Sequence, residues 1–408
     1  MESIAGVRAQ KLIIGVIVML FAGVIYSWSI LKTPFIIGDN YSQLGLTYTI
    51  ALISFCVGSV LSGLISKQST SSLRLVLSAM LSFSGFFLSS FLIITLPETQ
   101  NYTLLYMSYG VLGGTGMGIA YNTIISTMNT WYPDRRGFCS GLLITGFGLS
   151  VLIIGRVIDI MGHSEAFGWE STYILLAVAM GVVFIVAAAV IKLPPRGLNI
   201  TVSKKSKVKT RAEEAKDFTT LQMIRKPVFI LIFVYTTFIT ATGSAAIGFA
   251  GDIIKDIGAK GDTVVTVIGL VGVSNGLGRL SSGFLFDNIG IKKTQFVSSI
   301  IAVLAPCTVI FALMTGFVTV GIVGLCLCGL SLGFAPTTCS VFASEYFGAK
   351  YFPLNFGIMA LILIPASFAS ALAGSVRAET GEFTMAFIIL AGLALIGFAV
   401  NLGIKKPK

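Results

Sequence analysis

Charged residues are scarce in this chain of 408 residues. Asp, Glu, Lys and Arg make up 11% of it, whereas an ordinary soluble domain carries roughly 25%. Hydrophobic residues make up 55% of the sequence. Because a surface that faces water on all sides cannot be built from such a composition, the sequence excludes a water-soluble globular protein.

Residues that build metal and catalytic sites are also rare. The chain has one histidine, His163, and six cysteines, none of which forms a Cys-x-x-Cys pair. The cysteines all fall in or at predicted helices, and we interpret them as small packing residues. The hydrophobic stretches contain no paired acids, and no Gly-rich phosphate loop occurs. We therefore expect no catalytic residue, no metal, no cofactor and no enzymatic activity.

Long apolar stretches take the place of the missing charge. Each can cross about 30 Å of hydrocarbon as a helix, and their many glycines favour close helix packing in lipid. The first, Leu12 to Leu31, is too long for a signal peptide. We predict an all-α integral membrane protein of twelve transmembrane helices in two pseudo-symmetric six-helix bundles. The helices are expected near residues 12–31, 44–66, 74–96, 102–130, 138–160, 171–192, 228–250, 263–286, 294–314, 317–343, 352–376 and 383–404.

Lysine and arginine concentrate in the connections on one side of the predicted helices. The connections on the other side keep Lys32, Lys255, Lys260 and Arg377. Since cytoplasmic loops carry the excess of positive charge, we expect both termini in the cytoplasm and a multi-pass protein of the plasma (inner) membrane. The cytoplasmic Lys and Arg residues account for the net charge of +11, and they lie next to the anionic inner leaflet of the membrane. The expected partner is therefore the lipid bilayer and not nucleic acid.

One long polar interval divides the predicted helices six and six. We assign residues 1–193 to an N-terminal six-helix bundle, 194–226 to a basic cytoplasmic linker and 227–408 to a C-terminal six-helix bundle. The linker is interpreted as a solvated connection that lets the two halves move, with a regulatory or partner-binding role as the alternative.

The two halves are related in sequence. At an offset of 215 the matching pairs are Gly114 and Gly329, Gly118 and Gly333, Ala120 and Ala335, Thr123 and Thr338, and Trp131 and Tyr346; at an offset of 220 they are Gly58 and Gly278, Ser62 and Ser282, and Gly63 and Gly283. Two parallel six-helix repeats around a linker are typical of secondary transporters, in which the substrate site lies where the repeats meet.

The end of the eighth predicted helix contains Gly283, and Asp287 and two lysines follow it. A glycine permits tight packing, and an aspartate can cap a helix terminus. This pattern resembles the GxxxD…G…R/K loop of the major facilitator superfamily. The matching loop of the first half keeps Gly63 but has Lys67 in the place of the acid. We interpret Gly283 and Asp287 as conformational, gating residues.

Further segments resemble the oxalate/formate antiporter family and the related monocarboxylate transporters, over nearly the whole chain. They are Gly-Val-Ile-Tyr-Ser-Trp-Ser at 23–29, the run Asn-Thr-Trp-Tyr-Pro-Asp-Arg-Arg-Gly at 129–137, Ser140-Gly141, Gly-Phe-Gly at 146–148 and Asn355-Phe356-Gly357. The resemblance implies the major facilitator fold and transport of small carboxylates. Arg135 and Arg136 in the second segment join the predicted gating residues.

Arg279 is the only charged residue within the predicted helices of the second half. An arginine at a bilayer centre costs roughly 2.5 to 3.5 kcal/mol even on a lenient insertion scale. An anionic substrate can compensate this charge, because a guanidinium donates two parallel hydrogen bonds to a carboxylate. The alternative is an arginine that extends to the cytoplasmic surface about two turns away.

Asn275 lies four residues before Arg279, on the same face of the helix, where it can orient the guanidinium or contact the substrate. The transporters that this segment resembles carry an acid or Asn at this spacing, and members that exchange oxalate carry a second cation, a Lys, in helix 11. Here helix 11 lacks Lys and Arg, and Leu363 stands at about that place. A dianion would keep one charge uncompensated in a low-dielectric site, so a monocarboxylate is preferred.

Five more residues are candidates for substrate binding, and two further residues for proton chemistry. The first group is Tyr26, Trp28, Tyr121, Asn122 and Phe147. Tyr121 matches a site aromatic of the family that the chain resembles, whereas lone aromatics in membrane helices are more often packing residues. Asp159 lies three residues after Arg156 and either forms a salt bridge at the membrane edge or acts in proton coupling. His163 is either solvated or senses pH.

The function predicted from the sequence is secondary active transport. The substrates are small monocarboxylates of the lactate, pyruvate, formate or acetate type, moved by alternating access with the carboxylate bound at Arg279, together with a proton or a counter-anion. An oxalate/formate-type dicarboxylate antiporter is the first alternative, and a transporter-like membrane anion sensor is the alternative from another class. We expect a monomer.

Overall fold

The computed structural model describes residues 4–37, 41–99, 101–195 and 216–407, and within these ranges every regular element is a helix. The predicted all-α fold is therefore confirmed. The lysines and the arginine expected in the middle of the linker, residues 204–211, lie outside the described residues.

Contacts between residues divide the chain into two compact units. Unit 1 comprises Met1–Pro133, Gly146–Thr201 and Phe356–Ile358; unit 2 comprises Asp134–Thr145, Val202–Asn355 and Met359–Lys408. The units follow the two halves of the chain, except that a short stretch of each half belongs to the unit formed by the other. The predicted boundaries at 193 and 226 stay a prediction.

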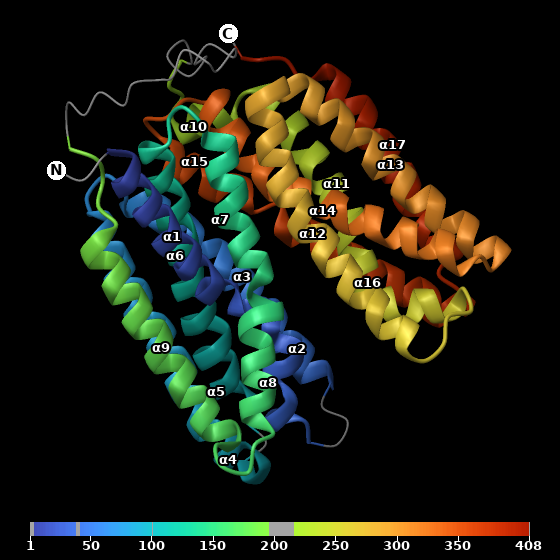
Figure 1. The fold of residues 1–408 in the computed structure, drawn as a ribbon, viewed down its shortest axis with the longest axis horizontal. Coiled ribbons are helices and arrows are strands. Elements are labelled where there is room, and N and C mark those ends of the chain that lie inside the picture. The colour runs from blue at the N-terminus through green and yellow to red at the C-terminus, as the bar shows by residue number, and fades with distance from the viewer. Residues whose placement is uncertain (1–3, 38–40, 100, 196–215, 408) are drawn as a thin grey trace. The chain divides into compact units, whose positions relative to one another are not determined.

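Unit 1 contains the first predicted helices, several of them interrupted. Its elements are α1 (Ile4–Ala22), the 3-10 turn η1 (Gly23–Ser27), α2 (Trp28–Leu31), η2 (Thr33–Phe35), α3 (Tyr41–Ile65), α4 (Ser71–Thr99), α5 (Tyr102–Leu105), the π-helical η3 (Tyr106–Gly113), α6 (Gly114–Trp131), the second part of α7 (Arg136–Ser150), the π-helical η4 (Val151–Gly155), α8 (Arg156–Gly162) and α9 (Gly168–Val190). In this unit α4 packs against α9, and α3 packs against α6 (Figure 1).

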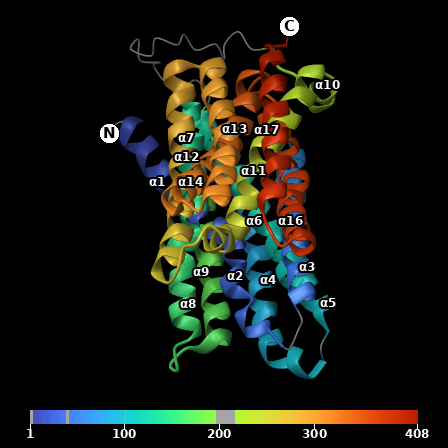
Figure 2. The ribbon, with the colours of Figure 1, turned by 90° about the vertical axis from the view of Figure 1, so that its right-hand side faces the viewer.

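Unit 2 contains the remaining helices together with the first part of α7. Its other elements are α10 (Thr220–Ile224), α11 (Pro227–Asp256), α12 (Asp262–Ile289), α13 (Ile291–Thr315), α14 (Val318–Glu345), α15 (Phe352–Ala360), α16 (Leu363–Thr380) and α17 (Thr384–Gly403). Pro227 begins α11 at a position where a missing N–H costs nothing. Helix α13 packs between α14 and α17, and α13 and α17 run side by side (Figure 2).

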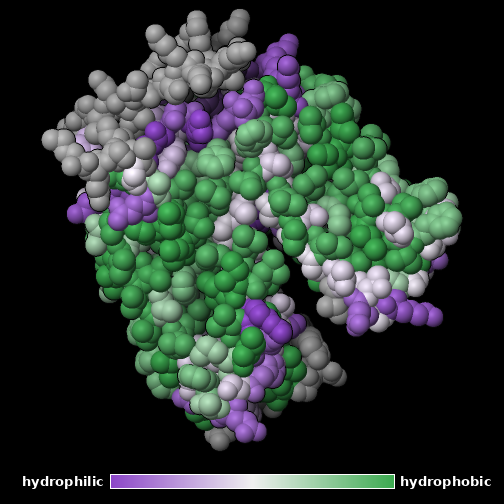
Figure 3. Space-filling view, viewed as in Figure 1, coloured by the Kyte–Doolittle hydropathy of each residue, from purple (hydrophilic) through white to green (hydrophobic). Residues whose placement is uncertain are grey.

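Eleven helical stretches among the described residues are long and apolar enough to cross a membrane. The predicted helix at 102–130 is not one of them, although α5, η3 and α6 follow one another from Tyr102 to Trp131. Polar residues such as Asn122 and Asn129 in α6 are buried there, and they lower its hydropathy. Hydrophobic side chains cover the flanks of both units, while hydrophilic ones gather at the ends of the helices (Figure 3).

Glycines bring the same pairs of helices into backbone contact in both units. A Cβ added to Gly118 in α6 would lie against the carbonyl of Phe55 in α3, and a Cβ added to Gly333 in α14 would lie against the carbonyl of Asn275 in α12. These two contacts correspond, because Gly333 follows Gly118 by 215 residues and Asn275 follows Phe55 by 220 residues. Two further pairs of contacts match at the same offsets. Gly114 contacts Ala51 as Gly329 contacts Val271, and Gly58 contacts Thr115 as Gly278 contacts Leu330. The sequence relation between the halves is therefore also a relation between their packing.

The end of the predicted linker is folded against unit 2. Phe218 is buried and its backbone N–H donates to the carbonyl of Phe347 at 3.0 Å. The side chain of Asn355 donates to the carbonyl of Phe218 at 3.1 Å, and Thr220 donates to the Asn355 amide oxygen at 2.8 Å. Thr219 and Gln222 form a reciprocal cap at the start of α10. The described part of the linker is thus attached to the start of α15.

We predict that Gly333→Ala destabilises the protein. Its new methyl group would press on the backbone of Asn275 and Arg279, and overpacking of this kind costs about 1 to 3 kcal/mol. Gly269→Ala in α12 is the matched control, because a Cβ there would have no neighbour within 4 Å. Thermal unfolding of both variants in detergent should give a lower midpoint for the first and no loss for the second; equal midpoints would contradict the packing argument.

Candidate functional site

Helix α12 places Arg279 in the interior of unit 2. The residue is 3% exposed, and its Nη1 donates to the carbonyl oxygen of Ile144 in α7 at 2.7 Å. Gly141 in α7 and Gly333 in α14 allow this position, since a Cβ on either would lie within 3 Å of the Arg279 backbone. A cation is therefore held among close-packed apolar helices, where the low dielectric strengthens its interaction with any anion that reaches it.

Asn275 lies one turn before Arg279 on α12. Its amide oxygen Oδ1 is buried and makes no hydrogen bond within the described residues. Such an acceptor is costly to leave unpaired in an apolar environment. The side chain is thus able to accept a hydrogen bond from a donor that the protein itself does not supply.

The predicted gating residues meet at the other end of α12. Asp287 accepts hydrogen bonds from the backbone N–H groups of Gly137, at 3.1 Å, and Phe138, at 2.7 Å. Both donors lie in the first turn of α7, where a carboxylate is favoured by unpaired N–H groups and the helix dipole. A Cβ on Gly283 would collide with the carbonyl of Gly137, so this glycine allows the two helices to meet.

An ion pair accompanies this contact. Arg136 Nη1 lies 3.8 Å from Glu345 Oε1 at the end of α14. The hydroxyls of Ser140 and Ser340 form a hydrogen bond of 2.8 Å between the same two helices. Arg135 precedes α7 and makes no ion pair of its own among the described residues. The first part of α7 is thus attached to unit 2 by charge and by backbone hydrogen bonds.

Three of the predicted substrate residues belong to one aromatic cluster in unit 1. The rings of Tyr26 and Tyr121 both contact the ring of Phe147, with centroids 5.2 and 5.0 Å apart. Phe55 and Phe356 complete the cluster: Phe55 lies 5.2 Å from Tyr121 and Phe356 stacks on it at 5.7 Å. Sequence reasoning missed Phe55, which no motif marks, whereas Phe356 lies in the Asn-Phe-Gly segment quoted above.

The structure places Trp28 and Asn122 elsewhere. Trp28 packs its ring on Tyr109, 4.4 Å away, and donates to the carbonyl of Leu44 at 3.0 Å. Asn122 is fully buried and donates to the hydroxyl of Ser59 at 3.1 Å. These two side chains therefore contact other groups than the aromatic cluster.

Asp159 lies in α8, beyond the π-helical turn that follows α7. Its carboxylate is 3.3 Å from Arg156 and 3.3 Å from the ring nitrogen Nδ1 of His163. The Arg156 side chain is 71% exposed, which agrees with a salt bridge at a surface. Proton coupling through Asp159 stays a prediction.

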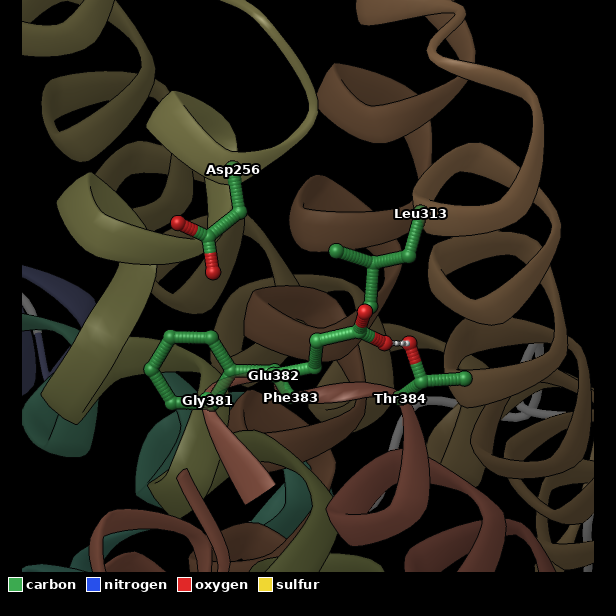
Figure 4. A pocket seen from close by; sticks show the side chains of 6 residues that line it. All are labelled: Asp256, Leu313, Gly381, Glu382, Phe383 and Thr384. Carbon is green, nitrogen blue, oxygen red and sulfur yellow. Dashed lines mark hydrogen bonds between the residues drawn. The ribbon is translucent and has the colours of Figure 1, made fainter. Parts of the chain in front are cut away.

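A cavity of about 210 Å³ opens at the end of unit 2 that lies away from Asp287. Asp256, Glu382 and Thr384 line it with Phe383 and Leu313, and Thr384 donates to Glu382 at 3.3 Å (Figure 4). These residues lie near the end of α11 and the start of α17, whereas Arg279 lies about 25 Å along α12 from its first residue at 1.5 Å per residue. This cavity is thus separate from Arg279. The described residues contain no group of three or more His, Cys, Asp or Glu side chains that could hold a metal.

Comparison with known proteins gives relatives over almost the full length. The oxalate:formate antiporter of Oxalobacter formigenes is 26% identical over 97% of this chain and 91% of its own. Monocarboxylate transporter 12 of Xenopus laevis is 19% identical over 90% of this chain and 81% of its own.

A solved structure and a family model agree with these relatives. The proton:xylose symporter XylE has a TM-score of 0.74 at 15% identity, covering 99% of this chain and 96% of that protein, which shows a shared fold. The model of the Major Facilitator Superfamily matches residues 12–371. The chain therefore belongs to the Major Facilitator Superfamily and is a membrane transporter, not an enzyme.

Proposed function

We propose that this transporter moves small monocarboxylates, of the lactate, pyruvate, formate or acetate type, by alternating access. The observation that carries the proposal is the buried Arg279 on α12. Its planar fork of donors suits a carboxylate, and the hydrogen bond to Ile144 engages Nη1 with a carbonyl dipole that does not neutralise the charge. The two relatives named above, an oxalate:formate antiporter and a monocarboxylate transporter, support the same class of substrate.

A substrate with one negative charge suits this site better than a dianion. The eleventh predicted helix, at 352–376, corresponds to α15 and α16 in the structure. These two helices contain no Lys or Arg before Arg377. Arg377 already forms a bidentate ion pair with Asp256 and lies over the ring of Phe383. Its charge is therefore compensated. Oxalate, with two carboxylates, remains the alternative because of the resemblance to the antiporter.

Asn275 extends the proposal to the body of the substrate. Its unpaired Oδ1 accepts a hydrogen bond, so it favours a substrate that carries a donor near the carboxylate. The 2-hydroxyl of lactate is such a donor, whereas the keto group of pyruvate is not. In this proposal Arg279 binds the carboxylate and Asn275 discriminates between 2-hydroxy and 2-keto acids.

The contacts of Asp287 and Gly283 with α7 serve as one of the gates in this proposal. Asp287 caps α7 in the described state, and release of that cap would remove one of the contacts that hold the first part of α7. We place both termini in the cytoplasm of a monomeric carrier of the plasma (inner) membrane, with a proton or a counter-anion as the coupled species. An anion sensor is the alternative, and binding without counterflow in liposomes would favour it.

We expect Arg279→Gln to lower lactate uptake into proteoliposomes at least about thirtyfold, since one partner of a buried charged pair is lost. Lys255→Gln is the matched control, because Lys255 is an exposed cation in the last turn of α11 and should keep wild-type uptake. Labelled lactate, pyruvate, formate and oxalate should be measured side by side. Equal uptake by wild type and Arg279→Gln would remove Arg279 from the mechanism.

Asn275→Leu should lower lactate uptake about three- to tenfold, because the loss of one neutral hydrogen bond weakens binding by about that factor. Pyruvate uptake should change less. The comparison of the two acids within one variant controls for folding and expression. A drop of equal size for both acids would show that Asn275 acts on the guanidinium and not on the hydroxyl of the substrate.

Leu363→Lys should raise the uptake of oxalate relative to formate, because it supplies a second positive charge at the start of α16. Leu363→Met keeps the apolar character of the position and should leave that ratio unchanged. Counterflow of labelled oxalate against formate measures the effect. An unchanged ratio in Leu363→Lys would argue against charge count as the reason for the preference.

A further inference from the structure

Unit 1 contains a second buried arginine that the transport proposal does not use. Arg74 lies in the first turns of α4 and is 3% exposed. The only hydrogen bonds of its guanidinium in the described part of the chain go from Nη1 to Ser62, to the carbonyl at 3.5 Å and the hydroxyl at 3.4 Å. Both distances are near the upper limit for a hydrogen bond. Its Nε is buried and has no hydrogen-bond partner within the described residues.

Within the described residues, Arg74 forms no ion pair with a carboxylate. The described acids of unit 1 are Glu98 in the last turn of α4, Asp159 in α8, Glu165, and Glu170 in the first turn of α9. All of these lie toward the end of the unit that is opposite to Ser71, because α4 runs away from Ser71 and α9 runs back toward it, as the hydrogen bond from Ser71 to Ile191 shows.

The end of unit 1 at Ser71 is rich in positive charge, with the acid Asp134 following α6 two residues after Tyr132. We call it the basic end; the basic residues described there are Arg8, Lys11, Lys67, Arg74 and Lys192. Lys11 donates to the carbonyl of Val190, and Arg8 lies over the ring of Tyr132. The N-terminus of α4 adds the positive end of its helix dipole. An uncompensated buried charge is costly, so this end favours an anion.

Neutral donors lie on the helices beside Arg74. The Ser62 hydroxyl pairs with that of Thr123 on α6 at 2.9 Å. One turn further along α6, on the same face, the buried hydroxyl of Thr127 has no partner within the described residues. A tetrahedral oxyanion accepts hydrogen bonds from donors of this kind, namely a guanidinium with an unpaired Nε–H and a hydroxyl without a partner.

We propose that Arg74 binds a phosphate-type oxyanion at the basic end of unit 1. The source is either the headgroup of an anionic lipid or a free phosphate, since both offer the same chemistry to the guanidinium. Lys192, an exposed cation at the same end, raises the local concentration of either anion. This site does not depend on the identity of the transported substrate.

The test is the thermal unfolding midpoint of the delipidated protein in neutral detergent. One arm adds inorganic phosphate, with chloride at the same ionic strength as its control; the other adds phosphatidylglycerol, with phosphatidylcholine as its control. Arg74→Gln is compared with Lys67→Gln, which removes an exposed cation at the same end. The wild type and Lys67→Gln should gain stability from an anionic additive, and Arg74→Gln should lose that gain.

The two arms separate the sources of the anion. A gain with phosphatidylglycerol alone assigns the site to a lipid headgroup, and a gain with phosphate as well assigns it to a free oxyanion. If Arg74→Gln does not fold, Arg74→Lys keeps the charge but not the fork of donors and should bind the additive about tenfold more weakly. No gain in the wild type, or an equal gain in the Arg74 variants, would overturn the proposal.

Discussion

The cost of an unpaired polar group in a hydrocarbon environment is the constraint on which this structure depends. The end of α9 illustrates how it is met, since a helix leaves its last carbonyls without partners. Lys11, Ser71 and Trp131, from three different helices, donate to the carbonyls of Val190, Ile191 and Lys192. Asn275 and Arg74 are among the buried side chains that keep a polar atom without a hydrogen-bond partner in the described residues, and each is therefore able to bind a partner from outside the protein.

The two units share their helix packing but differ in the polar groups at corresponding positions. The glycine contacts between α3 and α6 recur between α12 and α14 at corresponding positions. Ser59 and Arg279 also correspond at the offset of 220, yet Ser59 accepts a hydrogen bond from Asn122 while Arg279 donates to Ile144. The backbone arrangement is thus shared, whereas the charge that we propose to bind the substrate is present only in unit 2 at this position.

The all-α membrane fold and the family could be predicted from the sequence because both depend on long apolar stretches and local motifs. Asp287 was expected to cap a helix, but only the structure identifies α7 as that helix. Tyr26, Tyr121 and Phe147 were singled out as substrate-binding candidates, and that role stays a prediction. Their contact with one another and the addition of Phe55, which carries no local signal, come from tertiary packing. The hydrogen bond from Arg279 to a backbone carbonyl could not be predicted, because carbonyl groups occur at every residue and only tertiary packing selects one of them.

The contact of Arg279 with Ile144 also links the proposed substrate site to the proposed gate. Ile144 lies in the first part of α7, the same segment that Asp287 caps at Gly137 and Phe138. A carboxylate that draws the guanidinium toward itself weakens its bond to Ile144, because the charged acceptor is preferred over the carbonyl. One of the bonds that hold this segment in unit 2 is then lost while the Asp287 cap remains. Substrate binding at Arg279 would therefore lower the cost of releasing α7, which is the coupling that alternating access requires.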